Sequence, residues 1–252
     1  HIVGKLIEHP DVDKIVMTDN FSTGKKENIL SFLNSPKFSF CEGDISNLKT
    51  CMEVAKGMDI ICHQAAIGSV PRSIKDPLTT NKININGTLN VFYAAKENNI
   101  KKIVFASSSS VYGDNFSLPQ KEEIIGNPLS PYAVTKQTGE LYAEVFSKTF
   151  DFNFIGLRYF NVFGPKQDPK GQYAAVIPFF FINILKDNPT AITINGDGLQ
   201  SRDFTYVDNV VQANINAIFS DDKKSWNNVY NIACGKRTSV LELFKIICKI
   251  AG

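Results

Sequence analysis

A tyrosine and a lysine four residues apart have the types and the spacing with the clearest potential for chemistry in this sequence. Ser130 suits a helix N-cap and Pro131 suits the first helical position. Tyr132 is therefore expected in the first turn, with Lys136 on the same face one turn later. An ammonium beside a phenol favours the phenolate, and lowering a tyrosine pKa from about 10 to about 7 requires roughly 4 kcal/mol. Alone, however, this spacing is also that of an ordinary surface pair.

The segment upstream of the pair gives it weight. Ser107 to Ser110 follow a predicted strand, and the helix that begins at Pro131 comes later in a chain that alternates strands and helices. This combination, and not the spacing alone, predicts a reactive tyrosine.

Two acidic residues at predicted strand ends indicate a nucleotide. At the end of the second strand of a dinucleotide-binding unit, a carboxylate such as Asp19 accepts hydrogen bonds from the adenosine ribose and repels a 2'-phosphate, which favours NAD over NADP. Asp44 follows the next strand and could hold an adenine amino group while Ile45 packs on the ring. Each carboxylate has a simpler alternative, because Asp also forms turns and caps helices. The glycine-rich phosphate loop of such a unit is expected just ahead of His1.

Short apolar runs alternate with longer amphipathic runs along the whole chain. Predicted strands are residues 14–19, 38–41, 59–63, 102–106, 153–157, 191–194 and 229–232. Predicted helices are residues 48–56, 79–98, 131–149, 176–186, 207–219 and 240–250. This order predicts an α/β, Rossmann-like, doubly wound parallel sheet with a smaller mixed substrate-binding domain.

The expected domains are an NAD-binding domain at residues 1–160 and a mainly substrate-binding domain at residues 161–252, with residues 229–252 as a candidate return to the first sheet. Residues 1–8 resemble the body of a helix with no strand ahead of it, and the chain stops after another helix. We therefore interpret the sequence as an internal fragment of a longer enzyme. Without the first strand, the sheet would expose apolar faces and unpaired edges.

Composition excludes several classes of protein. The chain has 252 residues, of which 43% are hydrophobic and 21% charged, so it is neither disordered nor fibrous. A net charge of +2 without blocks of like charge indicates no nucleic-acid partner. The longest apolar stretch, residues 174–185, contains Pro178 and is shorter than the roughly 20 residues of a membrane span, so no membrane partner is expected. Five cysteines without a C-x-x-C favour the reducing cytoplasm, and three histidines without ligand spacing predict no metal.

Six motifs follow one another in order. They are DNFSTG at 19–24, HQAAIGSVPRSIKDP at 63–77, SSSSVYGD at 107–114, LSPYAVTK at 129–136, RYFNVFGPKQDPKGQYAAVIP at 158–178 and NGDGLQSRDFTYVDN at 195–209. With them the sequence resembles the extended short-chain dehydrogenase/reductases that act on nucleotide sugars, and within that group the bacterial UDP-N-acetylglucosamine 4-epimerases. The resemblance covers essentially the whole chain.

The resemblance implies a UDP-sugar 4-epimerase that uses NAD. Tyr132, ionised, takes the proton of the sugar 4-hydroxyl while hydride passes from C4 to the nicotinamide. Lys136 lowers the tyrosine pKa together with the positive nicotinamide and bonds the nicotinamide ribose. Ser108, with Ser109, bonds the 4-oxygen. The 4-keto sugar then turns over about its diphosphate linkage and receives the hydride on its other face.

Binding residues follow from the same resemblance. Cofactor candidates are Asp19, Asn20, Ser22, Asp44, Ile45, Ala65, Ala66, Asn84, Lys136 and Tyr159. Substrate candidates are Ser69, Val70, Arg72, Asn161, Gln167, Tyr173, Ala175, Val176, Asn195 and Arg202. The two arginines are the strongest of these, because a guanidinium suits a diphosphate, whereas the alanines and valines could simply pack. His63 is expected to be a satisfied polar residue at a strand end.

Other functions of the same fold stay open. Nucleotide-sugar 4,6-dehydratases and UDP-glucuronate decarboxylases share the tyrosine and lysine, but they have an acid where this chain has only serines, which disfavours them. The nearest rival is a UDP-glucuronate 4-epimerase, although residues 68–72 and 172–176 favour an N-acetylhexosamine. A non-catalytic NAD(P) sensor would lack the tyrosine or the lysine. The resemblance also implies a homodimer that pairs through the helices predicted at 79–98 and 131–149.

Overall fold

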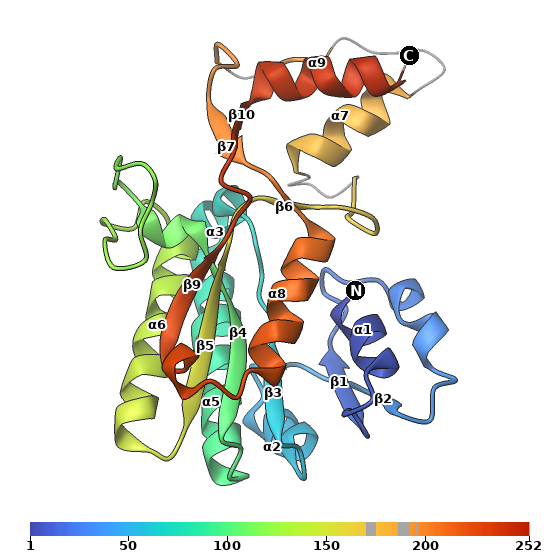
Figure 1. Ribbon diagram of the computed structural model, residues 1–252, viewed down its shortest axis with the longest axis vertical. Coiled ribbons are helices and arrows are strands. Elements are labelled where there is room, and N and C mark those ends of the chain that lie inside the picture. The colour runs from blue at the N-terminus through green and yellow to red at the C-terminus, as the bar shows by residue number, and fades with distance from the viewer. Residues whose placement is uncertain (170–174, 186–191, 195, 252) are drawn as a thin grey trace. The chain divides into compact units, whose positions relative to one another are not determined.

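The computed structural model describes residues 1–169, 175–185, 192–194 and 196–251 (Figure 1). The chain divides into two compact units. One comprises His1–Arg158 and Val211–Asn231, and the other comprises Tyr159–Val210 and Ile232–Gly252. The domain limits expected from the sequence, 1–160 and 161–252, stay a prediction.

Parallel strands form the centre of the first unit. Strands β1 (Ile15–Asp19) and β2 (Phe38–Glu42) pair in parallel along their whole lengths. A four-stranded sheet has the order β3-β4-β5-β9, with β3 at Ile60–His63, β4 at Lys102–Ser108, β5 at Asn153–Tyr159 and β9 at Asn228–Ile232. Strands β3 and β4 are parallel. The apolar runs of β4 and β5 are buried almost throughout, as is typical of strands covered on both faces. The predicted α/β, Rossmann-like fold is confirmed.

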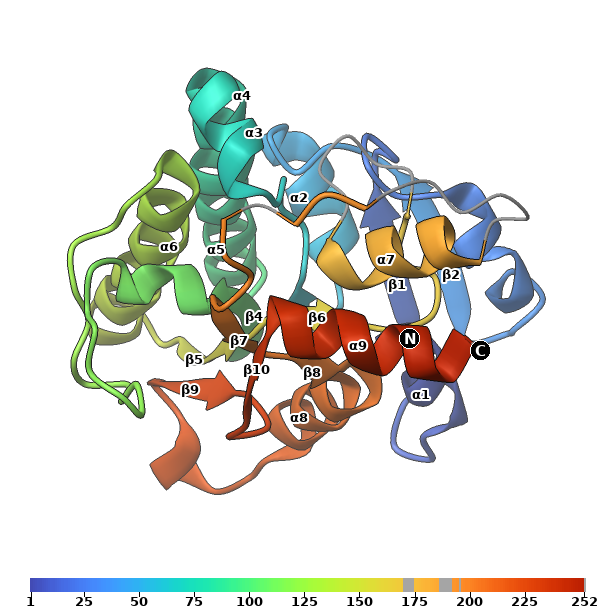
Figure 2. The same ribbon diagram turned by 90° about the horizontal axis from the view of Figure 1, so that it is seen from above.

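Helices lie on both sides of these strands (Figure 2). The helices α2 (Leu48–Ala55), α5 (Gly87–Glu97) and α6 (Pro131–Thr149) lie on one side, and α8 (Val207–Phe219) lies on the other. Both α6 and α8 have the bounds predicted from the sequence. Within the described residues, no helix combines the length and the apolar character that crossing a membrane requires.

Shorter helical segments connect the strands. They are α1 (Ile2–Glu8), α3 (Val70–Lys75), α4 (Pro77–Asn81), a π-helical turn at Lys82–Asn86, and 3-10 turns at Lys26–Asn28, Leu30–Phe32, Ser109–Tyr112 and Lys223–Ser225. The single helix predicted at 79–98 is thus replaced by α4, the π-helical turn and α5. Helix α3 was not predicted, although Ser69 caps it and a proline occupies its first turn.

An aromatic cluster fills the core between α5, α6 and the four-stranded sheet. Phe92 is fully buried, and its ring centre lies 5.7, 5.9 and 5.6 Å from those of Phe105, Phe146 and Phe152. These separations are typical of favourable edge and offset contacts between aromatic rings. The cluster packs α6 against the sheet and so supports the helix that carries Tyr132.

An apolar cavity of about 590 Å³ lies between the two sheets of this unit. Residues from the whole of β1 and the whole of β3 line it, together with side chains of α1, α2 and α8. Because β1 pairs with β2 and β3 pairs with β4, the sheet is interrupted at this point among the described residues.

The second unit is built from short strands and two helices. Strand β6 (Val162–Phe163) is parallel to β8 (Thr205–Tyr206), and β7 (Ser201–Asp203) is antiparallel to β10 (Arg237–Ser239). Helices α7 (Val176–Ile184) and α9 (Val240–Ala251) pack through Ile177, Phe180, Leu243 and Ile247. The strand predicted at 191–194 is wrong over the described residues 192–194, because Ile192 and Ile194 pack against this cluster and pair with no strand.

Candidate active site

Helix α6 begins at the cap that the sequence predicted. Ser130 has an extended backbone, and its Oγ accepts a hydrogen bond from the N–H of Ala133 at 3.1 Å. Pro131 occupies the first helical position, and the N–H of Tyr132 donates to Ser73 Oγ at 3.0 Å. These bonds satisfy donors that a helix start otherwise leaves unpaired, and so they fix the turn that carries Tyr132.

Removal of the cap hydroxyl should destabilise the protein by about 1 kcal/mol, because the Ala133 N–H loses its acceptor. We expect a Ser130→Ala variant to show this loss of unfolding free energy in urea denaturation. Ser147→Ala is the matched control, because the Ser147 hydroxyl donates to the Glu144 carbonyl within α6, at 2.8 Å, and caps no helix start. The control should change the unfolding free energy by less than about 0.5 kcal/mol. Equal losses in the two variants would show that the cap has no special role.

Consecutive residues of β4 contact residues of α6 that lie one turn apart. The pairs are Ser108 with Tyr132, Ala106 with Lys136, and Ser107 with Glu140. Lys136 Nζ donates to the Ala106 carbonyl at 2.8 Å, and the Ser108 side chain hydrogen-bonds the Tyr132 phenol. The structure therefore brings together three of the four predicted catalytic residues, and Ser109 opens the 3-10 turn that follows directly.

Desolvation shifts the pKa values of both Tyr132 and Lys136. Burial raises the pKa of Tyr132, and the hydrogen bond with Ser108 opposes this shift. Burial also lowers the pKa of Lys136 to about 8, while the Glu140 charge opposes it. Lys136 Nζ lies 5.9 Å from the centre of the Tyr132 ring. The lowered tyrosine pKa expected from the sequence therefore requires a second positive charge in addition to Lys136.

His63 at the end of β3 is a neutral, hydrogen-bonded residue. Its Nε2 lies 2.9 Å from Thr88 Oγ1. Burial lowers the pKa of His63 to about 3, and the nearby Lys136 charge acts in the same direction. The sequence interpretation of His63 as a satisfied polar residue is confirmed.

Asn84 lies at the centre of the π-helical turn and is buried. Its Oδ1 accepts from the N–H of Ile67 at 2.8 Å, and its Nδ2 donates to the Ile67 carbonyl at 3.0 Å and to Thr135 Oγ1 at 3.1 Å. These bonds tie the segment after β3, which contains Ala65 and Ala66, to α6. Both polar atoms of the amide are engaged within the protein, so its predicted contact with the cofactor stays a prediction.

The predicted adenosine residues lie at the carboxyl ends of β1 and β2. Asn20 Nδ2 donates to Asp44 Oδ2 at 2.9 Å, and Asn20 Oδ1 accepts from the Ser22 N–H at 3.0 Å. The carboxylates of Asp19 and Asp44 each accept from the backbone N–H two residues later, at 2.7 Å. Burial raises the pKa of Asp44, but hydrogen bonds from Ser46 and Asn20 leave it below its ordinary value. Ile45 is buried in the core.

Ser69 and Arg72 are substrate candidates in the first unit. Ser69 Oγ accepts from the Arg72 N–H at 3.3 Å and caps α3, next to the exposed side chain of Val70. Ser69 has φ of 94°, a conformation that serine adopts only under strain. Such strain is frequently found at functional sites.

The other substrate candidates belong to the second unit. Asn161 Nδ2 donates to the Asp203 carbonyl at 3.0 Å, Gln167 Nε2 donates to the Val162 carbonyl at 3.3 Å, and Arg202 Nη1 donates to the Ser201 carbonyl at 2.9 Å. Ala175 is the N-cap residue of α7 and Val176 is its first residue. The cofactor candidate Tyr159 ends β5. Tyr173 and Asn195 lie outside the described residues.

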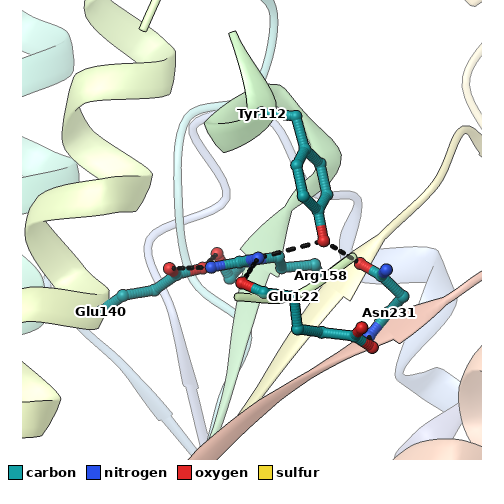
Figure 3. Close-up of polar contacts among 6 residues, drawn as sticks. Tyr112, Glu122, Glu140, Arg158 and Asn231 are labelled. Atoms are coloured by element: carbon teal, nitrogen blue, oxygen red, sulfur yellow. Dashed lines mark hydrogen bonds and ion pairs between the residues drawn. The ribbon is translucent and has the colours of Figure 1, made fainter. Parts of the chain in front are cut away.

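A buried ion pair that the sequence analysis missed lies beside the contacts between β4 and α6 in the first unit (Figure 3). Arg158 Nε donates to Glu140 Oε1 at 2.9 Å and Nη2 donates to Oε2 at 2.7 Å, and the Arg158 side chain is only 3% exposed. Ser107 Oγ donates to the same carboxylate at 2.5 Å. Two signals were available in the sequence. Arg158 is a charged residue at the end of an apolar strand, and Glu140 continues the four-residue spacing of Tyr132 and Lys136.

Comparison with known families agrees with this geometry. Residues 1–233 match the NAD dependent epimerase/dehydratase family. The chain belongs to this family. The family resemblance deduced from the sequence is thereby confirmed.

Several members of the epimerase family resemble the chain over nearly its whole length. A putative UDP-glucose 4-epimerase of Methanocaldococcus jannaschii is 41% identical over 250 residues, which are 98% of this chain and 77% of the relative. The structure of a UDP-N-acetylglucosamine 4-epimerase from Methanobrevibacter ruminantium, in complex with UDP-N-acetylmuramic acid, is 43% identical with a TM-score of 0.91, covering 99% of this chain and 77% of that one. The structure of a UDP-glucuronic acid 4-epimerase from Bacillus cereus, in complex with UDP-glucuronic acid and NAD, is 33% identical with a TM-score of 0.90. The match covers 100% of this chain and 79% of that one.

NAD is the cofactor of the epimerase family, and the residues of this chain fit it. The carboxylates of Asp19 and Asp44 stand at the carboxyl ends of neighbouring parallel strands, where α/β sheets bind nucleotides. Asp19 would hold the ribose of the adenosine and Asp44 its adenine. Lys136, whose Nζ lies beside the Tyr132 ring, would hold the nicotinamide ribose.

Proposed function

We propose that the chain is a UDP-N-acetylglucosamine 4-epimerase that interconverts UDP-GlcNAc and UDP-GalNAc, with UDP-Glc and UDP-Gal as further substrates. The relatives support NAD-dependent 4-epimerisation of a UDP-sugar as the general activity. The observation that carries the proposal is the desolvated Tyr132 phenol, which hydrogen-bonds Ser108 and lies beside Lys136. This arrangement can accept and return a proton at a sugar hydroxyl.

The residues of this chain divide the proton chemistry among them. Tyr132 takes the proton from the sugar 4-hydroxyl and later returns it to the 4-oxygen. Ser108, held next to the phenol, bonds the same oxygen, with Ser109 beside it. Lys136 stabilises the phenolate electrostatically. NAD, when bound, supplies the transient oxidation and reduction of the C4 carbon.

The serine segment argues for epimerisation over dehydration. Elimination of the 6-hydroxyl needs a general acid near the catalytic tyrosine. Residues 107–110 are all serine, and Glu140, the carboxylate next to them, is bound to Arg158 through both oxygens. A carboxylate engaged in this way is a poor proton donor. The 4,6-dehydratase and decarboxylase readings are therefore disfavoured.

The choice of sugar rests on two sequence segments and one relative. Residues 68–72 and 172–176 favour an N-acetylhexosamine, and the UDP-N-acetylglucosamine 4-epimerase from M. ruminantium is 43% identical. The glucuronate epimerase from B. cereus is 33% identical, and it supports UDP-glucuronate as the second candidate substrate. Arg72 and Arg202 are proposed to bind the diphosphate and the nucleotide, respectively.

Separate incubations of the full chain with UDP-GlcNAc and UDP-glucuronate, in the presence of NAD, test this proposal. We expect UDP-GalNAc to form with the higher kcat/KM, measured by chromatographic separation of the 4-epimers. A higher kcat/KM for UDP-glucuronate would assign the second candidate. Absence of turnover, together with absence of an NADH absorbance band after exposure to each UDP-sugar, would instead indicate a non-catalytic sensor.

We also propose a homodimer that pairs through the helical residues 79–98 and through α6. Val134, Leu141 and Val145 are 43%, 56% and 56% exposed, and their spacing places them on one face of α6. An apolar stripe of this kind suits packing against the same helix of a second copy.

A further inference from the structure

The ion pair between Glu140 and Arg158 lies where charges are costly. The side chains are 11% and 3% exposed, respectively. The desolvation of a buried pair often exceeds its Coulombic gain, so a buried pair is weak evidence for a role in stability. Its position relative to the active-site lysine suggests a different role.

Glu140 is anchored next to Lys136 by two independent elements. On α6 it lies one turn after Lys136, on the same face of the helix. On β4 the neighbouring residues Ala106 and Ser107 bind the two side chains, since the Ala106 carbonyl accepts from Lys136 Nζ and Ser107 Oγ donates to Glu140 Oε1. Ammonium and carboxylate are thus held by the same stretch of strand.

Arg158 orients the carboxylate and is itself held in place (Figure 3). Its two bonds to Glu140 use one nitrogen for each carboxylate oxygen, a fork geometry that fixes the carboxylate plane. The third nitrogen, Nη1, donates at 3.0 Å to both Tyr112 Oη and the Glu122 carbonyl. Tyr112 Oη in turn donates to Asn231 Oδ1 at 2.6 Å. Strand β5 and the residues around it therefore lock the carboxylate in one orientation.

We propose that Glu140 is a positioning residue that maintains Lys136 as an ammonium ion, and that Arg158 and Ser107 hold Glu140 in place for this role. The proposal rests on the proposed function, in which the Lys136 charge supports the Tyr132 phenolate. Glu140 touches neither substrate nor cofactor in this account and acts through Lys136.

The groups around Lys136 leave Glu140 as its source of negative charge within the described residues. On α6 itself, Tyr132 lies one turn before Lys136, and burial favours its uncharged form as long as NAD is not bound. From β3, His63 is neutral and hydrogen-bonded to Thr88 on α5. From β5, Arg158 lies on the Glu140 carboxylate. Burial lowers the pKa of Lys136 to about 8, and the Glu140 charge opposes that shift.

The test is a direct titration of Lys136 in the full chain with saturating NAD. The lysine Cε resonances of isotope-labelled protein are followed by NMR against pH, and a Lys136→Met sample assigns the signal. Glu140→Gln should lower the midpoint of Lys136 by about one pH unit, because it removes the negative charge of Glu140 and leaves the positive charge of Arg158 in place. Glu144→Gln is the matched control, one turn further along α6, where Glu144 is exposed and pairs with Lys148. The control should leave the midpoint unchanged.

A double variant guards against misfolding of the single one. Glu140→Gln combined with Arg158→Gln removes both charges, so no unpaired guanidinium remains buried. Its Lys136 midpoint should lie below that of the wild type but above that of Glu140→Gln. A midpoint equal to that of the wild type, in whichever of the two variants folds, would overturn the proposal.

A kinetic readout separates this inference from the proposed function. Above the Lys136 midpoint the ammonium is lost, so the alkaline limb of kcat against pH should move to lower pH in Glu140→Gln by the same amount as the NMR midpoint. If the wild type epimerises UDP-sugars but the limb and the midpoint do not move, the role of Glu140 is refuted and the proposed function stands. If the wild type has no turnover, the proposed function fails, and the NMR titration still decides the role of Glu140.

Discussion

A Tyr132→Phe variant is expected to lose between about 10²-fold and 10⁴-fold in kcat for the UDP-sugar that the wild type epimerises. Phenylalanine keeps the ring in its packed position but removes the hydroxyl that bonds Ser108. The proton of the sugar 4-hydroxyl then has no acceptor. Binding of the nucleotide sugar should persist, because the affinity comes from the rest of the substrate. The measurements are kcat by chromatography of the 4-epimers and Kd for the UDP-sugar by calorimetry.

Tyr142→Phe provides the control for this loss. Tyr142 stands on the same helix and packs against the aromatic core, 6.4 Å from the ring centre of Phe146. Its substitution should leave kcat within about twofold of the wild type, because Tyr142 is a half-buried residue more than two helical turns from Tyr132. Near-normal turnover in Tyr132→Phe would remove the tyrosine from the mechanism. Equal unfolding free energies of the two variants would attribute the lost rate to chemistry and not to misfolding.

The sequence predicted those parts of the fold whose signals are local. Helix α6 has its predicted bounds because Ser130 and Pro131 mark its start chemically and a long amphipathic run continues it. Strands β1, β3, β4 and β5 lie within two residues of their predicted limits, because buried parallel strands are continuous apolar runs. Tyr132, Lys136 and Ser108 meet as predicted, since a strand end and a helix start are neighbours in this fold.

Other elements depend on partners that are distant in the sequence. Strands β6, β7, β8 and β10 have two or three residues each, too few for a periodic pattern. The apolar alternation at 191–194 predicts a strand, yet Ile192 and Ile194 pack beside α7 and α9. Such a short run is equally consistent with a strand in a sheet and with an irregular segment packed against helices, so only the tertiary contacts decide between the two.

Within the site, the ion pair of Glu140 and Arg158 likewise depends on residues that are distant in the sequence. Helical spacing alone places Glu140 on the face of Lys136. Nothing local to residue 158 indicates that its guanidinium reaches Glu140, because α6 and β5 are brought together only by the sheet and the aromatic core. Electrostatic support of a catalytic group is therefore harder to predict than the catalytic group itself.

Lys136→Met should reduce kcat by about 10-fold to 10³-fold at pH 7, with partial recovery as the pH rises. Loss of the ammonium raises the pKa of Tyr132, and each unit of increase lowers the phenolate fraction tenfold at a fixed pH below that pKa. Methionine retains the unbranched chain, although the Ala106 carbonyl loses its donor, which costs about 1–3 kcal/mol of unfolding free energy. The measurement is kcat against pH from 6 to about 10, with urea denaturation in parallel.

The shape of this profile separates the two roles assigned to Lys136. If the lysine supports the phenolate, the acid limb of kcat moves to higher pH in Lys136→Met, whereas Tyr132→Phe gains nothing from alkaline conditions. Lys148→Met, on an exposed part of the same helix, should reproduce the wild-type profile. A loss in Lys136→Met that is equal at every pH would contradict support of the phenolate. It would leave Lys136 with a binding role alone, and it would require another source for the charge that brings the desolvated Tyr132 phenol to ionisation.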